Sequence, residues 1–362
     1  MQRLYLDANA TEPMRPEAIA AMAEAMALPG NPSSVHAEGR AARRVLEEAR
    51  EAIAARFGAR GRDIVFTSGG TEANALAIRG LAAGRRVLVG ATEHPAVLAA
   101  AGSEAEVIPV LSDGTLDLAA LEAALKRGSP ALVAVMAANN ETGVLHPIEA
   151  IAELCRQHGA LLHLDAVQMP GRLPFTLGAA VSMALSAHKL GGPKGVGALL
   201  LRPGLDPAPL LTGGGQESGR RGGTEALPAI AGFAAAITCP RPEGLARRRD
   251  AIEAGVKALA PEVIIAGDTA PRLPNTTSLI LPGVMAETQV IALDLAGVAV
   301  SAGAACSSGK VRQSHVLAAM GYGAEAASAI RVSLPWNAPE DIAARFLAAW
   351  GGMRDRLRPR QR

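Results

Sequence analysis

Hydrophobic residues along the chain follow two patterns: some recur at helical intervals, and others form short uninterrupted runs. In residues 36–58, Leu46, Ala49, Ile53 and Phe57 recur at helical intervals, while charged residues occupy another face. A surface helix packs such an apolar stripe against the core. The spacing therefore predicts an amphipathic helix over 36–58.

Beyond residue 62, short apolar runs alternate with further helical patterns. The apolar runs cover residues 63–68, 85–91, 105–110, 131–140, 160–168, 181–189 and 195–204, and the helical patterns cover residues 71–83, 116–128 and 147–159. Strands that are apolar on both faces and separated by helices indicate a parallel sheet with helices on each side. We predict an α/β fold with a mainly parallel, seven-stranded sheet, whose ligands bind at the carboxyl ends of the strands.

A second, smaller α+β domain is predicted after a change in composition near residue 240. The stretch CPRPEGLARRRD, residues 239–250, is rich in proline and arginine, and another helical pattern and further apolar runs follow it. Such stretches are typical of domain boundaries. We expect a large domain at 13–244 and a small domain that joins 1–12 with 245–362.

The composition is typical of a compact soluble protein. Of the 362 residues, 49% are hydrophobic and 19% charged, and the 2% that are aromatic provide no stacking surface for nucleic acid. The net charge is +2, with basic residues spread along the chain, so neither nucleic acid nor an anionic membrane is an expected partner. The N-terminal stretch lacks a signal-peptide pattern and every apolar run is too short to cross a membrane, which predicts a cytoplasmic protein.

The chain has three cysteines, Cys155, Cys239 and Cys306, and no CxxC motif. This odd number and wide spacing favour neither a disulfide framework nor a metal site. We interpret Cys155, within a helical pattern, and Cys239 as structural. Cys306 differs because the stretch SAGAACSSGK, residues 301–310, surrounds it with small residues. A thiol in such a stretch is suited to movement and reaction.

The sequence SGGTEAN, residues 68–74, joins an apolar run to a helical pattern. One interpretation is an ordinary helix start, with glycine in the turn and Thr71 as the N-cap. The other is a phosphate site, because the free N–H groups of a helix start attract anions. The chain contains neither GxGxxG nor GxxxxGKS, so dinucleotide and Walker-type binding lose support.

Two apolar runs end in residues with ionisable or reactive side chains. Asp165 ends one of them, and Ser186, His188 and Lys189 end the next. Taken alone, Lys189 is interpreted as a solvated loop lysine. Together with the helix start, however, the set matches pyridoxal phosphate. The lysine amine forms a Schiff base, the carboxylate keeps the pyridine nitrogen protonated, and the helix start binds the phosphate.

The motifs of the chain resemble those of cysteine desulfurases of the NifS/IscS type, which are class V aminotransferase-like, fold-type I pyridoxal phosphate enzymes. They extend over nearly the whole chain and include YLDANAT, GNPSSVH, TSGGTEAN, TEHPAV, NNETG, HLDAVQ, SAHKLGGPKG, GGGQE, RRGGT, SAGAACSS and IRVSL. The resemblance implies the fold-type I architecture and pyridoxal 5'-phosphate as the cofactor. The departures from the family pattern are small: Glu12 stands where these enzymes often carry threonine, and Ala302 and Ala304 stand where serine is common.

The resemblance also implies site residues. Cys306, Lys189 and His94 are the expected catalytic residues. The expected cofactor contacts are Gly70, Thr71, His94, Asn140, Asp165, Gln168, Ser186, His188, Lys189 and, from the other subunit, Thr224. Asn140 and Arg331 are expected to bind the substrate. From the residues alone, His94 can also be a satisfied loop histidine, and Arg331 part of an internal salt bridge.

The reaction implied by the resemblance converts L-cysteine to L-alanine. Cys306 takes the sulfur as a persulfide and passes it to an iron–sulfur scaffold or another sulfur acceptor, and the role of Thr224 implies a homodimer. A selenocysteine lyase or another class V activity is the alternative, which would need Lys189 and Asp165 but not Cys306. A non-catalytic protein that has kept the fold is disfavoured by the intact catalytic set.

Overall fold

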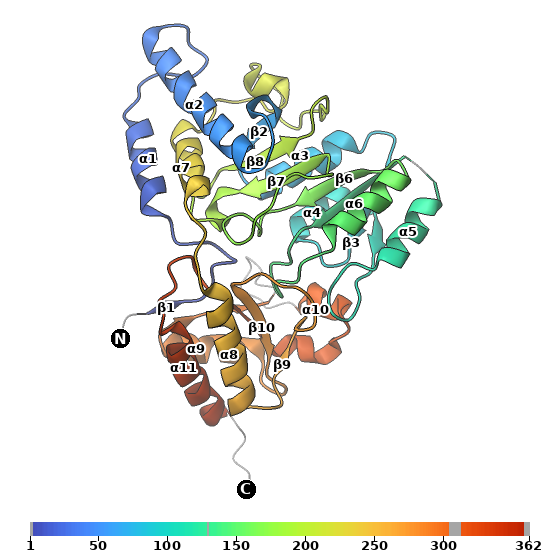
Figure 1. The fold of residues 1–362 in the computed structure, drawn as a ribbon, viewed down its shortest axis with the longest axis vertical. Coiled ribbons are helices and arrows are strands. Elements are labelled where there is room, and N and C mark those ends of the chain that lie inside the picture. The colour runs from blue at the N-terminus through green and yellow to red at the C-terminus, as the bar shows by residue number, and fades with distance from the viewer. Residues whose placement is uncertain (1–2, 129, 304–312, 358–362) are drawn as a thin grey trace.

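The fold is built around a seven-stranded sheet (Figure 1). In the computed structural model, the described residues are 3–128, 130–303 and 313–357. The strand order is β2 (Ile64–Thr67), β8 (Gly197–Leu201), β7 (Ser182–Ser186), β6 (Leu161–Asp165), β5 (Ala131–Met136), β3 (Arg86–Gly90) and β4 (Glu106–Ile108). Only the pairs that β8 makes with β2 and β7 are antiparallel. The predicted mainly parallel, seven-stranded sheet is confirmed.

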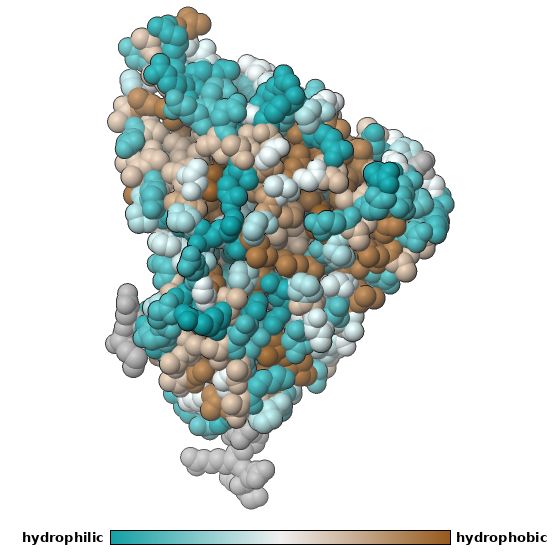
Figure 2. All heavy atoms as spheres, viewed as in Figure 1, coloured by the Kyte–Doolittle hydropathy of each residue, from teal (hydrophilic) through white to brown (hydrophobic). Residues whose placement is uncertain are grey.

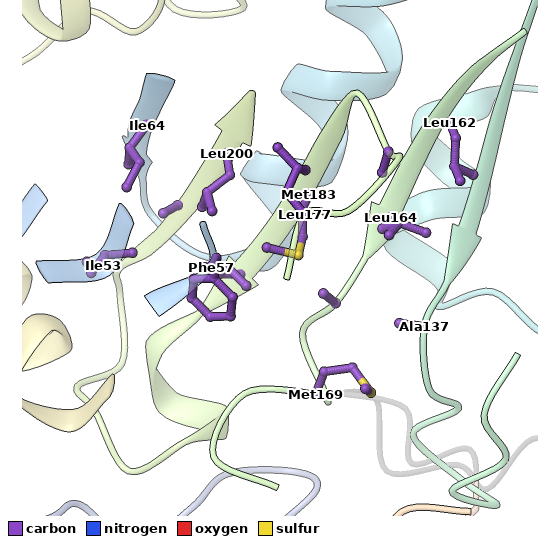
Figure 3. Packing of buried hydrophobic residues seen from close by; sticks show 14 of the residues in the cluster. Ile53, Phe57, Ile64, Ala137, Leu162, Leu164, Met169, Leu177, Met183 and Leu200 are labelled. Carbon is purple, nitrogen blue, oxygen red and sulfur yellow. The ribbon is translucent and has the colours of Figure 1, made fainter. Parts of the chain in front are cut away.

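Helices cover both faces of this sheet because its strands are apolar on both faces. One face packs against α2 (Ala37–Arg56), α5 (Leu118–Lys126), α6 (Ile148–Gln157) and α7 (Leu227–Thr238), with α1 (Pro16–Met26) against α7, and the other face packs against α3 (Gly70–Leu81) and α4 (Pro95–Ala101). Along β5, for example, Val133 and Val135 face the first group, and Leu132 and Ala134 face the second. Figure 3 shows part of the first layer.

The predicted amphipathic helix is confirmed as α2. Leu46, Ala49 and Ile53 are buried on its inner face, and Phe57 is buried directly after its end. In Figure 3, Ile53 and Phe57 lie beside Ile64 and other residues of the sheet. This packing explains why the apolar stripe of residues 36–58 specifies a helix at this position.

The remaining strands form two smaller sheets. The four-stranded sheet has the order β12 (Ser301–Ala302), β13 (Ala329–Ser333), β10 (Thr276–Ile280), β9 (Ile264–Ile265), and β1 (Leu4–Tyr5) pairs with β11 (Val298–Ala299). With them pack α8 (Leu245–Leu259), α9 (Ala286–Leu295), α10 (His315–Ala319) and α11 (Ile342–Leu357). Leu4 and Leu6 join Phe346 and Trp350 in a core separate from that of the large sheet. The N-terminal stretch therefore packs with the C-terminal third of the chain.

Hydrophobic and hydrophilic residues are mixed on the surface. On the face drawn in Figure 2, hydrophobic residues are interspersed with hydrophilic ones. Some described hydrophobic side chains are largely exposed, including Val35 and Leu295. No helix within the described ranges has the length and apolar character needed to cross a membrane.

His146 should make the free energy of unfolding depend on pH. Its Nδ1 accepts a hydrogen bond from the Leu116 N–H at 3.1 Å, and burial lowers its pKa to about 4. An unfolded histidine titrates near 6.5, so unfolding takes up a proton below that pH. The stabilisation is complete above pH 6.5 and is lost as the pH falls toward 4, with about 1 kcal/mol lost between roughly pH 6.5 and 5.5.

The variant His146→Asn tests this prediction. The amide oxygen of asparagine can accept the Leu116 N–H in place of Nδ1, but it does not titrate. Urea unfolding at the two pH values should therefore show a smaller loss of stability for the variant than for the unmodified protein. Equal losses in both proteins would contradict the assignment.

Candidate active site

A cavity of about 430 Å³ lies at the carboxyl ends of β5, β6 and β7, and β12 and β13 also contribute to its wall. Every predicted site residue in the described part of the chain, except Thr224, lines it: Gly70, Thr71, His94, Asn140, Asp165, Gln168, Ser186, His188, Lys189 and Arg331. Cys306 lies outside the described residues. The cavity is thus where the topology of a parallel sheet places a ligand.

The start of α3 supplies hydrogen-bond donors to this region. The helix begins at Gly70 after an N-cap at Gly69, whose φ of 155° favours glycine. Thr71 is already the second helical residue, so the prediction of Thr71 as the N-cap is wrong. The first helical hydrogen bond runs from the Ala73 N–H to the Gly69 carbonyl. The N–H groups before Ala73 therefore have no partner within the helix.

A hollow of about 350 Å³ lies at this helix start, and Ser186, His188 and Lys194 also line it. The pKa of His188 is lowered to about 4 by burial and then by Lys189 and Lys194. The ring is therefore neutral at neutral pH, and its Nδ1 lies 3.0 Å from the hydroxyl oxygen of Thr11. Backbone N–H groups, a serine hydroxyl and a lysine around one hollow are suited to binding phosphate.

Lys189 follows β7 in a short 3₁₀ turn, Ala187–Lys189. Its Nζ donates hydrogen bonds to the carbonyls of Asn9 at 2.6 Å and Ala10 at 3.0 Å. Burial, and then the charges of Arg331 and Arg172, lower its pKa to about 8. Roughly a tenth of Lys189 is therefore the neutral amine at pH 7, which is the nucleophilic form and far more than an ordinary lysine provides.

Asp165 ends β6 and is buried. Its Oδ2 accepts a hydrogen bond from Asn74 Nδ2 at 2.9 Å, and its Oδ1 accepts one from the Val167 N–H at 3.0 Å. Burial raises its pKa, while these two hydrogen bonds and the charges of His94 and Lys189 oppose the rise. The surroundings of Asp165 thus offset part of the cost of burying a carboxylate.

His94 is the N-cap of α4, and this contact fixes its proton. Nδ1 accepts a hydrogen bond from the Ala96 N–H at 3.1 Å, so the neutral ring carries its proton on Nε2. The pKa of His94 is lowered, first by burial and further by Lys189 and His315, against the attraction of Asp165. The neutral ring can therefore donate from Nε2.

His315, which the sequence reasoning did not select, lines the same cavity at the start of α10. Its Nε2 lies 2.9 Å from the Glu93 carbonyl oxygen. A carbonyl oxygen only accepts, so Nε2 must be the donor. The sequence signal that could have found His315 is a histidine soon after Cys306 and directly before an apolar run.

Arg331 lies in the middle of β13 and is 5% exposed. Its Nη2 donates to Asp7 Oδ1 at 2.7 Å, and its Nη1 donates to the Asn140 carbonyl at 3.1 Å. The internal salt bridge that the sequence left open is thus present, with an aspartate that the sequence reasoning did not select. A guanidinium has five N–H donors, so donors remain for a carboxylate in the cavity.

Gln168 is oriented by buried neighbours. Its Nε2 donates to the Asn9 carbonyl at 3.1 Å, and its Oε1 accepts from Arg172. Arg172 in turn lies 3.7 Å from a carboxylate oxygen of Glu12. Glu12, where related sequences often carry threonine, thus has a buried arginine beside it. Its pKa is nevertheless raised to about 7, because burial outweighs Arg172 and the Trp336 N–H.

Thr224 is exposed and does not line the cavity of its own chain. It follows a turn in which Glu217 and Ser218 adopt positive φ angles of 49° and 58°, a conformation that costs energy for residues other than glycine. Arg50 holds the turn through hydrogen bonds of 2.8 and 2.7 Å to the Glu217 carboxylate, which also accepts the Phe66 N–H at 2.8 Å.

Replacing Arg50 by alanine should lower the free energy of unfolding by about 3–5 kcal/mol, because the buried Glu217 carboxylate would lose its counter-charge. Urea unfolding measures the loss. Arg43→Ala is the matched control, since Arg43 pairs with Glu47 at the exposed surface of the same helix and such pairs contribute at most about 1 kcal/mol. A loss no larger than that of the control would contradict the prediction.

Pyridoxal phosphate needs an amine, a carboxylate and an anion site in one region. Lys189 provides an amine with a lowered pKa, Asp165 provides a buried carboxylate, and the start of α3 provides free N–H groups. The hollow at the helix start supplies the anion site. The donor set of these described residues therefore fits this cofactor.

Comparisons with known proteins agree with this arrangement. Residues 4–344 match the family described as Aminotransferase class-V. A cysteine desulfurase from Cereibacter sphaeroides is 45% identical over 364 residues, which cover 94% of this chain and 93% of that protein. An IscS-like cysteine desulfurase from Mycobacterium tuberculosis is 39% identical over 91% of each chain. The solved structure of a NifS-like protein from Rickettsia africae ESF-5 has a TM-score of 0.91 at 33% identity, covering 98% of this chain and 100% of that one.

The chain therefore belongs to the class-V aminotransferase family of pyridoxal phosphate enzymes, with the fold-type I architecture. Within that family it belongs to the cysteine desulfurases, as the motifs predicted. The predicted cofactor and enzyme class are confirmed, which sets aside the non-catalytic alternative.

Proposed function

We propose that this desulfurase converts L-cysteine to L-alanine and that Cys306 carries the sulfur away as a persulfide. The observation that carries the proposal is that Lys189, Asp165 and Arg331 line one cavity together. The Cys306 thiolate bonds to the substrate sulfur, and the substrate Cβ–S bond breaks. Its electron pair stays on Cβ, which takes up a proton to become the methyl group of alanine.

When bound, pyridoxal phosphate withdraws electrons from the substrate Cα and so weakens its bonds. Lys189 would hold the cofactor covalently, Asp165 would face the ring nitrogen, and Gln168 would contact the ring hydroxyl. The residues proposed to hold the phosphate are Gly70, Thr71, Ser186, His188 and, from a second subunit, Thr224. His94 would lie against the ring, and its Nε2 proton makes it a donor during proton transfer.

Arg331 and Asn140 would bind the substrate. The planar guanidinium suits the substrate carboxylate, and the ion pair with Asp7 holds its position. Asp7 carries a charge opposite to that of the substrate ammonium group, so the Arg331–Asp7 pair offers complementary charges to a zwitterionic amino acid.

The variant Arg331→Lys should raise the KM for L-cysteine by roughly 10- to 100-fold, since the loss of a two-pronged, charge-assisted contact costs about 1.5–3 kcal/mol. Steady-state kinetics with the pyridoxal phosphate-loaded protein measure this change, and the absorption spectrum of the bound cofactor serves as the control for an intact site. An unchanged KM would place the substrate carboxylate elsewhere.

The assembly and location belong to the same proposal. A homodimer is supported by the exposed position of Thr224, away from the cavity of its own chain. Separate hydrophobic cores support a large domain at 13–244 and a small one formed by 1–12 and 245–362. The sulfur acceptor would be an iron–sulfur scaffold or another sulfur carrier, in the cytoplasm. Relatives named IscS or IscS-like support an acceptor of this kind.

Product analysis tests the proposed function. The loaded protein, given L-cysteine and a reducing thiol, should form alanine and sulfide in equal amounts, because each cleaved Cβ–S bond yields one of each. L-Selenocysteine and an amino donor with a 2-oxo acid are assayed in parallel. Activity with either of these and none with L-cysteine would overturn the proposal in favour of another class V activity.

A further inference from the structure

Three buried polar side chains form a chain of hydrogen bonds that ends on Asp165. They are Asn74 of α3, His163 of β6 and Ser182 of β7, none of them more than 2% exposed. Ser182 Oγ lies 2.9 Å from His163 Nδ1, His163 Nε2 lies 2.9 Å from Asn74 Oδ1, and Asn74 Nδ2 lies 2.9 Å from Asp165 Oδ2. Of the three, only Asn74 lines the cavity.

Chemistry fixes the direction of each bond. A charged carboxylate only accepts, so the Asn74 amide group must donate to Asp165 and turn its oxygen toward His163. That oxygen only accepts, so His163 Nε2 carries the proton and Nδ1 has a free lone pair. The Ser182 hydroxyl therefore donates to Nδ1. Burial lowers the pKa of His163 to about 3, against an opposing hydrogen-bond contribution from the Ser182 backbone, so the ring remains neutral at neutral pH.

Packing alone does not explain these three hydrogen-bonded side chains. His163 and Ser182 are direct cross-strand partners between β6 and β7, inside a sheet whose other buried positions are mostly apolar. An apolar pair would pack in the same place without needing hydrogen-bond partners. The polar residues instead satisfy each other's hydrogen-bonding groups, and Asn74 directs one N–H donor at Asp165.

We propose that Asn74, His163 and Ser182 are positioning residues that keep Asp165 charged and oriented, so that the ring nitrogen of pyridoxal phosphate stays protonated. The inference rests on the proposed role of Asp165 and deepens it. These three residues, which we call the relay, act from a side that the substrate does not reach, because His163 and Ser182 do not line the cavity.

The other titratable groups near Asp165 cannot take over this task. His94 and Lys189 favour its charged form, but both lie in the cavity wall, where their proposed roles bring them into contact with the cofactor. Glu93, fully buried nearby, interacts unfavourably with Asp165 as a second carboxylate. The Val167 N–H and the relay are thus the contacts that favour the carboxylate independently of the ligand.

The test uses the holoenzyme loaded with pyridoxal phosphate labelled with ¹⁵N in the ring, because the ¹⁵N chemical shift reports whether that nitrogen carries a proton. His163→Leu removes the donor to Asn74, whereas His163→Gln retains an N–H group for it. We expect the pKa of the ring nitrogen to fall by about 0.5–1 in His163→Leu, because the variant removes the neutral hydrogen bond that orients Asn74 and leaves the Asn74 bond to the carboxylate in place. In His163→Gln it should stay close to that of the unmodified protein.

Two outcomes of this measurement separate the possible failures. If Asp165→Asn lowers the pKa of the ring nitrogen and His163→Leu does not, the relay is overturned and the role of Asp165 stands. If neither variant changes it, the role of Asp165 is overturned and the relay with it. Alanine formation by the unmodified protein tests the desulfurase activity separately. Should His163→Leu not fold, Ser182→Ala decides: a smaller fall in the same direction supports the relay, and an unchanged pKa overturns it.

Discussion

The variant Lys189→Ala should lose alanine production from L-cysteine by roughly 10⁴-fold or more, as expected for removing a covalent catalytic group. The position of Lys189 is the reason. Its amine is held by the carbonyls of Asn9 and Ala10, and its pKa of about 8 leaves roughly a tenth of it neutral at pH 7. An ordinary lysine, with a pKa of about 10.4, would be almost wholly charged and unreactive there.

Borohydride reduction followed by mass spectrometry provides a second readout for this variant. Reduction should fix one cofactor on each chain of the unmodified protein, at Lys189, and none on Lys189→Ala. Lys126→Ala is the matched control, because Lys126 pairs with Glu122 on the surface of α5, and it should retain both the label and the activity. A label that remains on Lys189→Ala would assign the covalent role to another lysine.

The residues of this site that the sequence predicts share one feature, a polar side chain at the end of an apolar run. Asp165 is the last residue of β6, and Lys189 lies in the 3₁₀ turn that directly follows β7. Because parallel strands align their carboxyl ends, residues at neighbouring ends reach one cavity whatever the details of packing. The family motifs then added His94 and Arg331, for which residue patterns alone left other interpretations open.

The contacts that orient these residues could not be predicted in this way. Asp7 and Arg331 are 324 positions apart and meet only through the packing of the N-terminal stretch on β13. The contact between His163 and Ser182 depends on the register of β6 against β7, which a sequence pattern leaves open by one residue. The predicted N-cap at Thr71 was wrong because the backbone at Gly69, with its positive φ, places the helix start two residues earlier.

A common physical effect connects the site residues. Burial lowers the pKa values of Lys189 and His188, and it raises that of Asp165. Each shift favours the uncharged form. For Lys189 this increases the nucleophilic form, whereas for Asp165 it opposes the charge that its proposed role beside the ring nitrogen requires. Hydrogen bonds are therefore most important around Asp165, and that is where the structure provides the Val167 N–H and Asn74.

The variant Cys306→Ala should lose turnover of L-cysteine by roughly 10³-fold or more, since no other thiol is suited to accept the sulfur. Burial raises the pKa of Cys155 to about 12, and the Cys239 thiol, whose pKa is also raised by burial, donates to the Ala235 carbonyl at 3.3 Å. Neither lines the cavity. By contrast, Gly303 and His315, on either side of the stretch that contains Cys306, both line it.

The cofactor should remain bound in Cys306→Ala, and its absorption spectrum should still change when L-cysteine is added, because every proposed binding residue is intact. Mass spectrometry of the unmodified protein after a single turnover should find one additional sulfur on the peptide that contains Cys306. Cys239→Ala, as the control, should keep its activity.

If Cys306→Ala turns over L-cysteine as fast as the unmodified protein does, Cys306 is not the sulfur acceptor. If the protein processes L-selenocysteine efficiently with or without this thiol and leaves L-cysteine intact, the enzyme is a selenocysteine lyase, which would need Lys189 and Asp165 but not Cys306.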